Sequence, residues 1–436
     1  MISLKLGLRN LVRNRWRSGL TLAAVAVAVG LMVWTLGFYE GWIQQMVRGA
    51  TAVETTQAQI HTAAYIERPR VYETFPLEDE QLRRIRAVPG VEAVSPRVEL
   101  NGLIGNEERS QVAHLVGVDP ELEARATPVT DGLVAGRWLS AAPAAYPAAR
   151  EIVLGDGLAR QLRVGPGDEL VVFLEAADGS LGNELLQVVG VVRTGNVQID
   201  RMTGYLHLRD AQYLGALGDG IHEVAIKARD ANDAIPVASA VASALAIRDG
   251  APPEGAVARG EVPEDALVVR PWQEILPSLS QMLVLFRQSY AFMYLLVYLV
   301  AAIGILNTQR MSAAERRREF GVLMAIGMRP RRMFRTLVVE TVVLGLVGAL
   351  IGAAGGALLT WYHATAGFDM GVLTSAGSAT FSYMGVAFSD RLYFDLYPGA
   401  VIQPVLVMLA VAALCGLWPA IKSARIDPAP TIAGRT

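Results

Sequence analysis

The side chains that most often perform chemistry are few and scattered in this sequence. Its five histidines lie at irregular intervals: His61, His114, His207, His222 and His363. Their spacing matches no zinc-ligand pattern, so structural or surface roles explain them best. The sequence also lacks the G-x-x-x-x-G-K-S/T loop that cradles ATP, the G-x-S-x-G elbow of hydrolases and the H-E-x-x-H zinc pair. We therefore predict that this chain is not an enzyme and has no catalytic, metal or cofactor-binding residue.

The densest cluster of charged side chains lies between residues 310 and 335, which hold eight arginines and two glutamates. Ser312 and Glu315 have the spacing of a capping box, which predicts that a helix begins at Ser312. An apolar stripe follows at helical spacing: Phe320, Leu323, Met324 and Met328. Gly327 allows this helix to end, and Pro330 favours the start of another.

This predicted helix combines two kinds of contact group. Glu315 and Glu319 lie four residues apart on one face and can meet basic groups. Phe320 and Leu323 offer an apolar anchor. A charged helix with an exposed apolar stripe needs either a protein or a headgroup layer to cover it, and the pattern favours a protein partner.

The elements that must position this helix are hydrophobic. The 436 residues are 52% apolar and 18% charged, so we expect part of the chain to lie in lipid. Four uncharged runs reach the roughly 20 residues needed to cross about 30 Å of hydrocarbon. They cover residues 18–39, 288–309, 341–368 and 396–421. The first run has 22 residues, which is longer than the core of a cleavable signal peptide.

Charges in the short segments outside these runs predict the topology. Residues 1–17, 310–335 and 422–436 together carry a net charge of +13, whereas the whole chain carries −2, so the other residues carry −15. Because basic segments stay in the cytoplasm, both termini and the loop at residues 310–335 are predicted to lie inside. The near-neutral total argues against a nucleic-acid partner.

Residues 1–17 have a helical charge pattern of their own. Lys5, Arg9, Arg13 and Arg17 recur every four residues beside a leucine-rich face. This spacing predicts an amphipathic elbow helix that lies along the inner membrane surface. The alternative is that these charges only set the topology.

Residues 48–282 differ in composition, with proline, glycine and charged residues throughout. We expect one large extracytoplasmic α+β domain there. Short aliphatic or β-branched runs predict strands at residues 55–61, 151–154, 169–174, 185–192 and 223–227. Helices are predicted at residues 78–87 and 233–246, and residues 248–265 read as a linker or a surface excursion.

Together these features predict an α-helical membrane protein with four transmembrane helices and the α+β domain between helices 1 and 2. The predicted order is elbow helix (1–17), transmembrane helix 1 (18–47), extracytoplasmic domain (48–282), transmembrane helix 2 (283–309), cytoplasmic loop (310–335), transmembrane helix 3 (336–366), external loop (367–397), transmembrane helix 4 (398–421) and cytoplasmic tail (422–436). Gly348, Gly352 and Gly356 predict close helix packing within the protomer. We expect Glu340 to pair with an arginine or to snorkel.

Three segments resemble one protein family. The loop ERRREFGVLMAIG at residues 315–327, the start LRNLVRN at residues 8–14 and the ending WPAIKSARIDP at residues 418–428 are similar to the FtsX-like, MacB-type permease family of ABC transporters. The resemblance implies that the loop is a coupling helix that docks on an ATPase, which holds ATP and Mg. The implied docking residues are Glu315, Arg316, Glu319, Phe320, Gly321, Leu323, Ala325 and Gly327. Phe320 stands where the family usually has isoleucine.

The resemblance also implies an assembly of two permease protomers, identical or related, with two ATPases. Members of the MacB efflux branch usually carry their ATPase fused ahead of the first span. Only 17 residues precede the first uncharged run here, so we expect the ATPase to be a separate chain.

Parts of the predicted extracytoplasmic domain resemble the lipoprotein-releasing branch of the family, the LolC/LolE type. They are GVDP at residues 117–120, GRWL at residues 136–139 and IVLGDGLARQLRVGPGD at residues 152–168. The resemblance implies a porter-like and a smaller inserted subdomain, and a location in the bacterial inner membrane. It also implies mechanotransmission, in which the ATP cycle moves the coupling helices, the spans tilt and the exported domains shift. A lipid-like substrate, first of all lipoprotein, would then be released at the outer face without crossing the membrane.

Two other functions within the family remain open. One is an efflux or peptide-resistance permease that works with a periplasmic adaptor. The other is a non-transporting regulator of cell-wall hydrolases, whose exported domain is usually much smaller. The expected partners are therefore the ATPase, a second permease protomer, the lipid bilayer and a periplasmic carrier or adaptor.

Overall fold

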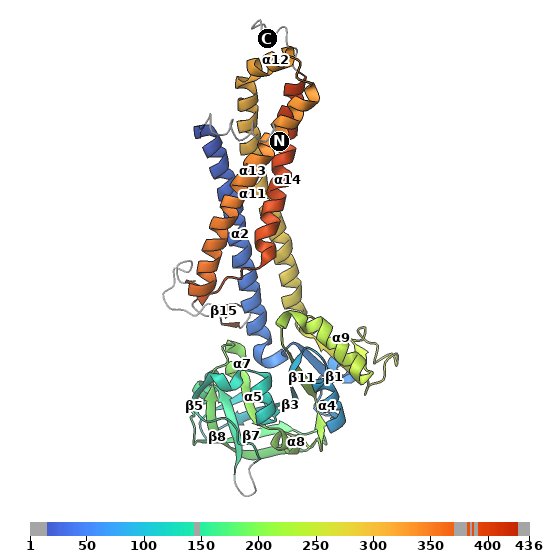
Figure 1. The fold of residues 1–436 in the computed structure, drawn as a ribbon. Coiled ribbons are helices and arrows are strands. Elements are labelled where there is room, and N and C mark those ends of the chain that lie inside the picture. The colour runs from blue at the N-terminus through green and yellow to red at the C-terminus, as the bar shows by residue number, and fades with distance from the viewer. Residues whose placement is uncertain (1–14, 144–148, 370–381, 384–385, 388–390, 426–436) are drawn as a thin grey trace. The chain divides into compact units, whose positions relative to one another are not determined.

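The computed structural model of the chain describes residues 15–143, 149–369, 382–383, 386–387 and 391–425 (Figure 1). Most of the predicted elbow helix, of the predicted external loop and of the predicted tail lies outside these residues, and residues 15–17 of the elbow are the start of helix α2 (Arg15–Ala50). The chain divides into two compact units. The helical unit comprises residues 1–43, 283–377 and 391–436, and the sheet unit comprises residues 44–282 and 378–390.

Four long helices make up most of the helical unit: α2 (Arg15–Ala50), α11 (Pro277–Glu315), α13 (Pro330–Ala366) and α14 (Pro398–Ala424). Their most apolar windows have mean hydropathies of 2.1 to 2.4, so all four are long and apolar enough to cross a membrane. Each predicted uncharged run falls on one of them. Helices α2 and α11 extend beyond their runs at both ends, α13 does so at its start and α14 at its end. Arginine, glutamate and glutamine also favour helical backbone, so a charge marks the limit of the lipid-compatible part and not the helix end.

Glycines allow α13 to pack closely against α2. A Cβ atom added to Gly352 would lie 2.3 Å from the carbonyl oxygen of Ala26, and one added to Gly356 would lie 2.6 Å from that of Gly30. The predicted packing within the protomer is confirmed. Buried residues from all four helices form the core of the unit: Val25, Val29, Val33, Ala301, Ile305, Ala349, Met408 and Ala412.

Three short elements complete the described part of the helical unit. They are α12 (Arg317–Ala325), β14 (Phe368–Asp369) and β17 (Arg391–Leu392). The two strands pair antiparallel.

The sheet unit is built on one 11-stranded sheet that has an open part and a closed part. The open part has the order β12 (Arg248–Asp249), β13 (Leu267–Pro271), β1 (Ala58–Thr62), β11 (Glu223–Ala228) and β3 (Val91–Gly105). Helices α4 (Asp79–Arg86) and α9 (Ala234–Leu245) contact each other and strands of this part.

The closed part is a barrel that begins with the same long strand β3. Going round it, β3 pairs with β4 (Ser110–Val118), then come β9 (Thr203–His207), β6 (Arg150–Gly155), β8 (Leu181–Val192) and β7 (Glu169–Glu175), which pairs with β3 again. Strand β5 (Leu133–Gly136) is added to the far edge of β8. Apolar residues of the barrel strands are buried together: Leu100, Leu115, Ile152, Leu170, Val188 and Leu206.

Short helices and turns connect these strands. They are η1 (Thr51–Thr55), α3 (Ala63–Glu67), α5 (Pro120–Ala126), η2 (Val129–Gly132), α6 (Asp156–Leu162), α7 (Val197–Met202), α8 (Leu208–Leu214), η3 (Ala231–Asp233) and α10 (Trp272–Ile275). Two further strand pairs are β2 (Phe75–Pro76) with β10 (Gly220–Ile221), and β15 (Ser382–Tyr383) with β16 (Val386–Ala387).

The predicted strands and helices of this region are all present, with shifted ends. Strand β1 begins at Ala58 and not at residue 55, because a π-helical turn, η1, follows α2 first. The expected linker at residues 248–265 is wrong as a linker, since Ala256 and Val262 are buried against Ala63. The open and closed parts share β3 and form one compact unit with the rest of residues 44–282.

Candidate functional site

The predicted coupling segment is a short helix between two long ones. Helix α11 ends at Glu315, α12 covers Arg317–Ala325, and α13 starts at Pro330. The prediction that a helix begins at Ser312 is wrong, because Ser312 lies inside α11. The break comes instead at Arg316, whose backbone leaves the helical range with φ −91° and ψ 8°.

Arg316 is held by side chains of the same chain. Its Nη1 atom lies 3.1 Å from both carboxylate oxygens of Glu340, near the start of α13. Its Nε atom lies 3.4 Å from Glu319, and its guanidinium carbon lies 5.1 Å from the centre of the Phe320 ring. The expected arginine partner of Glu340 is therefore confirmed, and Arg316 joins α12 to α13.

Phe320 faces the chain's own core. Its side chain is 1% exposed and packs with Met333, Leu337 and Ala420, so it contacts both α13 and α14. Gly321 is buried as well. The prediction that Phe320 anchors a partner is wrong, since its apolar surface is already covered within the protein.

A neighbouring side of the α12 segment is exposed and mixes acidic with apolar groups. Glu315, Glu319 and Ala325 are exposed, and Leu323 is 40% exposed. Two neighbours that were not predicted extend this face: Val322, 42% exposed, and Ile326, 79% exposed. Their spacing of four residues is the signal that could have identified them. We call these residues the α12 face: Glu319, Val322 and Leu323 of α12, with Glu315 at the end of α11 and Ile326 just after α12.

Gly327 ends this segment as predicted. Its φ is +100°, in the left-handed region that glycine adopts without strain, and nothing lies within 4 Å of the position of an added Cβ atom. A larger residue would therefore strain the backbone although it would meet no neighbour.

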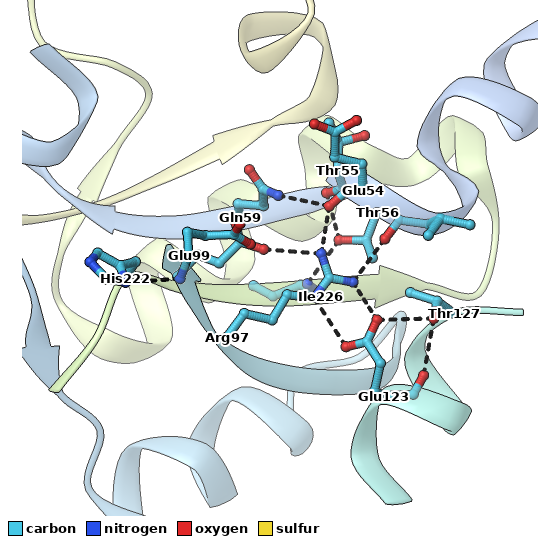
Figure 2. Close-up of polar contacts among 12 residues, drawn as sticks. Glu54, Thr55, Thr56, Gln59, Arg97, Glu99, Glu123, Thr127, His222 and Ile226 are labelled. Carbon is cyan, nitrogen blue, oxygen red and sulfur yellow. Dashed lines mark hydrogen bonds and ion pairs between the residues drawn. The ribbon is translucent and has the colours of Figure 1, made fainter. Parts of the chain in front are cut away.

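The sheet unit contains a buried polar cluster that sequence reasoning missed, centred on Arg97 of β3 (Figure 2). Arg97 donates hydrogen bonds to Glu123 at 2.6 and 3.0 Å and to Glu223 at 3.1 Å. It also donates to the backbone carbonyls of Val53 at 2.8 Å and Glu54 at 2.6 Å. These carbonyls belong to η1, the turn that follows α2, so Arg97 fixes η1 to the sheet.

The charges around Arg97 perturb each other strongly. Burial alone would lower the pKa of Arg97, but Glu123 and Glu223 outweigh it and raise the pKa. Burial and the charge of Glu99 raise the pKa of Glu223 to about 8. Next to them, His114 lies 2.5 Å from Glu99, and this carboxylate raises the pKa of His114 to about 9. The cluster places several charged groups in the interior of the sheet unit. Burying them is tolerated only while each charge is paired with an opposite one.

Comparison with known proteins identifies the chain. Residues 18–244 match the MacB-like periplasmic core domain, and residues 291–428 match the FtsX-like permease C-terminal family. The chain belongs to the FtsX-like, MacB-type family of ABC transporter permeases. The resemblance predicted from the sequence motifs is confirmed.

The permease is similar over nearly its whole length to lipoprotein-releasing transmembrane proteins. It is 25% identical to LolC of Xylella fastidiosa, over 99% of this chain and 98% of that protein. It is 23% identical to LolE of Haemophilus influenzae, over 94% and 93%. It is also 22% identical to the macrolide export ATP-binding/permease protein MacB of Agrobacterium fabrum, over 96% of this chain and 58% of that protein. Membership of the family implies an ATPase partner and a location in the inner membrane.

Proposed function

We propose that this permease couples ATP hydrolysis by a separate ATPase subunit to the extraction or release of a lipid-like substrate, first of all lipoprotein. The release takes place at the outer face of the inner membrane by mechanotransmission. In this arrangement α2, α11, α13 and α14 span the membrane, both termini and α12 face the cytoplasm, and the sheet unit is periplasmic. The excess of +13 in the short basic segments supports this orientation.

The two-sided environment of α12 is the observation that carries the proposal. Its α12 face is exposed, whereas its other side is fixed through Phe320 and Arg316. A partner that pulls on α12 therefore pulls on α13 through Glu340 and Met333, and on α14 through Ala420. Acidic groups beside apolar ones suit a protein surface with basic residues around an apolar pocket.

The contacts of the sheet unit could transmit a movement of α2 to its strands. The chain passes from the helical unit to the sheet unit within α2, and Arg97 bonds the carbonyls of the turn that follows this helix. A change in α2 would thus reach β3, which belongs to both the open part and the barrel. Similarity to LolC and LolE over nearly the whole chain supports lipoprotein as the first substrate to test.

Efflux is the second candidate, and the similarity to MacB over 96% of this chain favours it. The two functions differ in what must be present for turnover. Lipoprotein release needs an acylated protein and an acceptor, whereas efflux needs a small molecule or peptide and an adaptor.

The coupling step is tested with the permease and its ATPase subunit co-expressed and reconstituted in liposomes. Changing Leu323 to Asp, or Glu315 and Glu319 together to Lys, should reduce both co-purification of the ATPase and substrate-stimulated ATP hydrolysis at least tenfold. Leu323→Met keeps an apolar side chain of similar size and should behave as the wild type. Wild-type docking and stimulation in all charge variants, with normal membrane insertion, would mean that α12 is only a connector.

The substrate is tested separately. Liposomes that contain the permease, its ATPase and a triacylated lipoprotein should release the lipoprotein to a soluble acceptor when ATP is added. A non-acylated version of the same protein has no anchor in the liposome. It is the control and should not stimulate ATP hydrolysis. ATP-dependent movement of macrolides or peptides without lipoprotein release would favour the efflux function instead.

A further inference from the structure

A groove opens between the ends of α11 and α14 that carry the basic segments. Its volume is about 1040 Å³, and all of its lining residues belong to the helical unit. Its lining is mainly basic, aromatic and apolar, with two neutral polar side chains, Asn307 and Ser423. Its basic and aromatic residues are Arg310, Arg317, Trp418, Lys422 and Arg425, and Met311 is among the apolar ones.

The groove concentrates positive charge without compensation from the described residues. None of the four cations Arg310, Arg317, Lys422 and Arg425 forms an ion pair with a carboxylate of a described residue, and no aspartate or glutamate is among the residues that line the groove. Two of these cations gather at one ring, since Arg310 lies 5.2 Å and Lys422 lies 5.3 Å from the centre of the Trp418 indole. Four cations that line one groove without a paired carboxylate among the described residues favour the binding of an anion there.

The position of the groove along α11 and α14 places it at one end of their uncharged runs, the level of the lipid headgroups if these runs span the membrane. Arg310 and Lys422 are the first charged residues after the uncharged runs at 288–309 and 396–421. Trp418 lies one turn further into its run, as interfacial tryptophans do. On the apolar side of this level Ile303 is 51% and Leu414 is 66% exposed. The groove therefore has cations at headgroup depth and bare apolar surface directly beyond them.

Charge argues against the chain's own terminal segments as occupants. Residues 1–17 carry five basic and no acidic side chains, so they would be repelled by the groove. Residues 426–436 carry one aspartate and one arginine, which cannot neutralise four cations.

We propose that this groove binds the headgroup of an anionic phospholipid of the inner leaflet. The phosphate lies between Arg310 and Lys422, while Arg317 and Arg425 add to the positive field around it. The acyl chains follow the exposed apolar side chains of α11 and α14. A basic pocket between helices at the cytoplasmic side, with an aromatic residue at its rim, has the chemistry that recognises such lipids.

The test uses the full-length permease in detergent, with binding of phosphatidylglycerol and phosphatidylcholine followed by native mass spectrometry. The variant Arg310→Gln/Lys422→Gln removes two charges at the groove. At about 1 kcal/mol for each charge it should bind phosphatidylglycerol about 30-fold more weakly, with phosphatidylcholine binding unchanged. The control Arg331→Gln/Arg332→Gln removes two exposed charges of α13 that do not line the groove, and it should bind as the wild type.

Several outcomes would overturn the proposal. The first is equal binding of the two lipids by the wild type, and the second is an equal loss of phosphatidylglycerol binding in the control variant. The third is displacement of phosphatidylglycerol by the same concentration of inorganic phosphate. The fourth is its displacement by the purified ATPase subunit, which would make the groove a protein interface. If the double variant does not fold, Lys422→Gln alone should weaken phosphatidylglycerol binding about 5-fold, and wild-type affinity in that variant would also overturn it.

Discussion

Replacing Arg97 with methionine should destabilise the sheet unit by about 3 to 5 kcal/mol, the cost of breaking a buried ion pair. The change keeps much of the side-chain volume but removes the donors to Glu123, Glu223 and the carbonyls of Val53 and Glu54. The Glu123 side chain is 0% exposed and that of Glu223 is 7% exposed, so water cannot replace the lost guanidinium.

This loss of stability can be measured in the sheet unit itself by hydrogen exchange of the purified permease. Mass spectrometry then resolves the exchange of peptides from β3 and β4. A loss of about 3 kcal/mol lowers protection by a factor of about 100 in segments that exchange through unfolding of the sheet unit. Arg137→Met is the matched control. Arg137 pairs with Glu151 but is 54% exposed, so its loss should cost at most about 1 kcal/mol.

The Arg97→Met variant should also acquire a pH dependence of defined sign. In the wild type, burial and Glu99 already raise the folded-state pKa of Glu223 to about 8, above its unfolded value of about 4.5, and without the cation this pKa rises further. A raised carboxyl pKa contributes stability below about pH 4.5 that is lost as the pH rises through the folded value. The variant should therefore be closer to the wild type at pH 5 than at pH 8. A loss no larger than that of Arg137→Met, or a larger loss at pH 5 than at pH 8, would refute this account of the cluster.

Three further outcomes are expected. Glu99 raises the folded-state pKa of His114 to about 9, above the unfolded value of about 6.5, so the ion pair stabilises the fold fully below about pH 6.5 and loses this effect as the pH rises to about 9. With 31% of the His114 side chain exposed, we expect a contribution of about 1 to 2 kcal/mol to the free energy of unfolding. It is measured as a slope of unfolding free energy against pH, which His114→Asn should abolish. Gly352→Val should lower the melting temperature of the helical unit because its Cβ atom would lie 2.3 Å from the Ala26 carbonyl, whereas Gly355→Val on the same helix, with nothing within 4 Å, should not; equal effects would contradict the packing argument. The permease purified without its ATPase should hydrolyse no ATP in a phosphate-release assay, and activity in a subunit-free preparation would contradict this.

Much of the architecture follows from local properties of the sequence. A run without charges needs only its own length and composition to favour lipid, so all four long helices could be predicted. The motif at residues 315–327 could identify the family because it is one continuous stretch of sequence. Gly327 was predictable for the same reason, since its φ of +100° is a local requirement of the helix end.

Contacts between distant segments decided the rest. The apolar stripe of α12 placed Phe320 and Leu323 together, yet only packing against α13 and α14 shows that Phe320 is covered and Leu323 is open. Arg316, where the helix breaks, pairs with Glu340, which lies 24 residues away in the sequence and could not be found from local spacing.

The Arg97 cluster shows the same limit in the sheet unit. Arg97 is separated by 26 residues from Glu123 and by 126 residues from Glu223. A periodic pattern tells which residues share a face of one element, because that face is fixed by local backbone geometry. It does not tell which other element covers the face or which charge meets which, because these depend on pairings between segments that only the folded chain brings together.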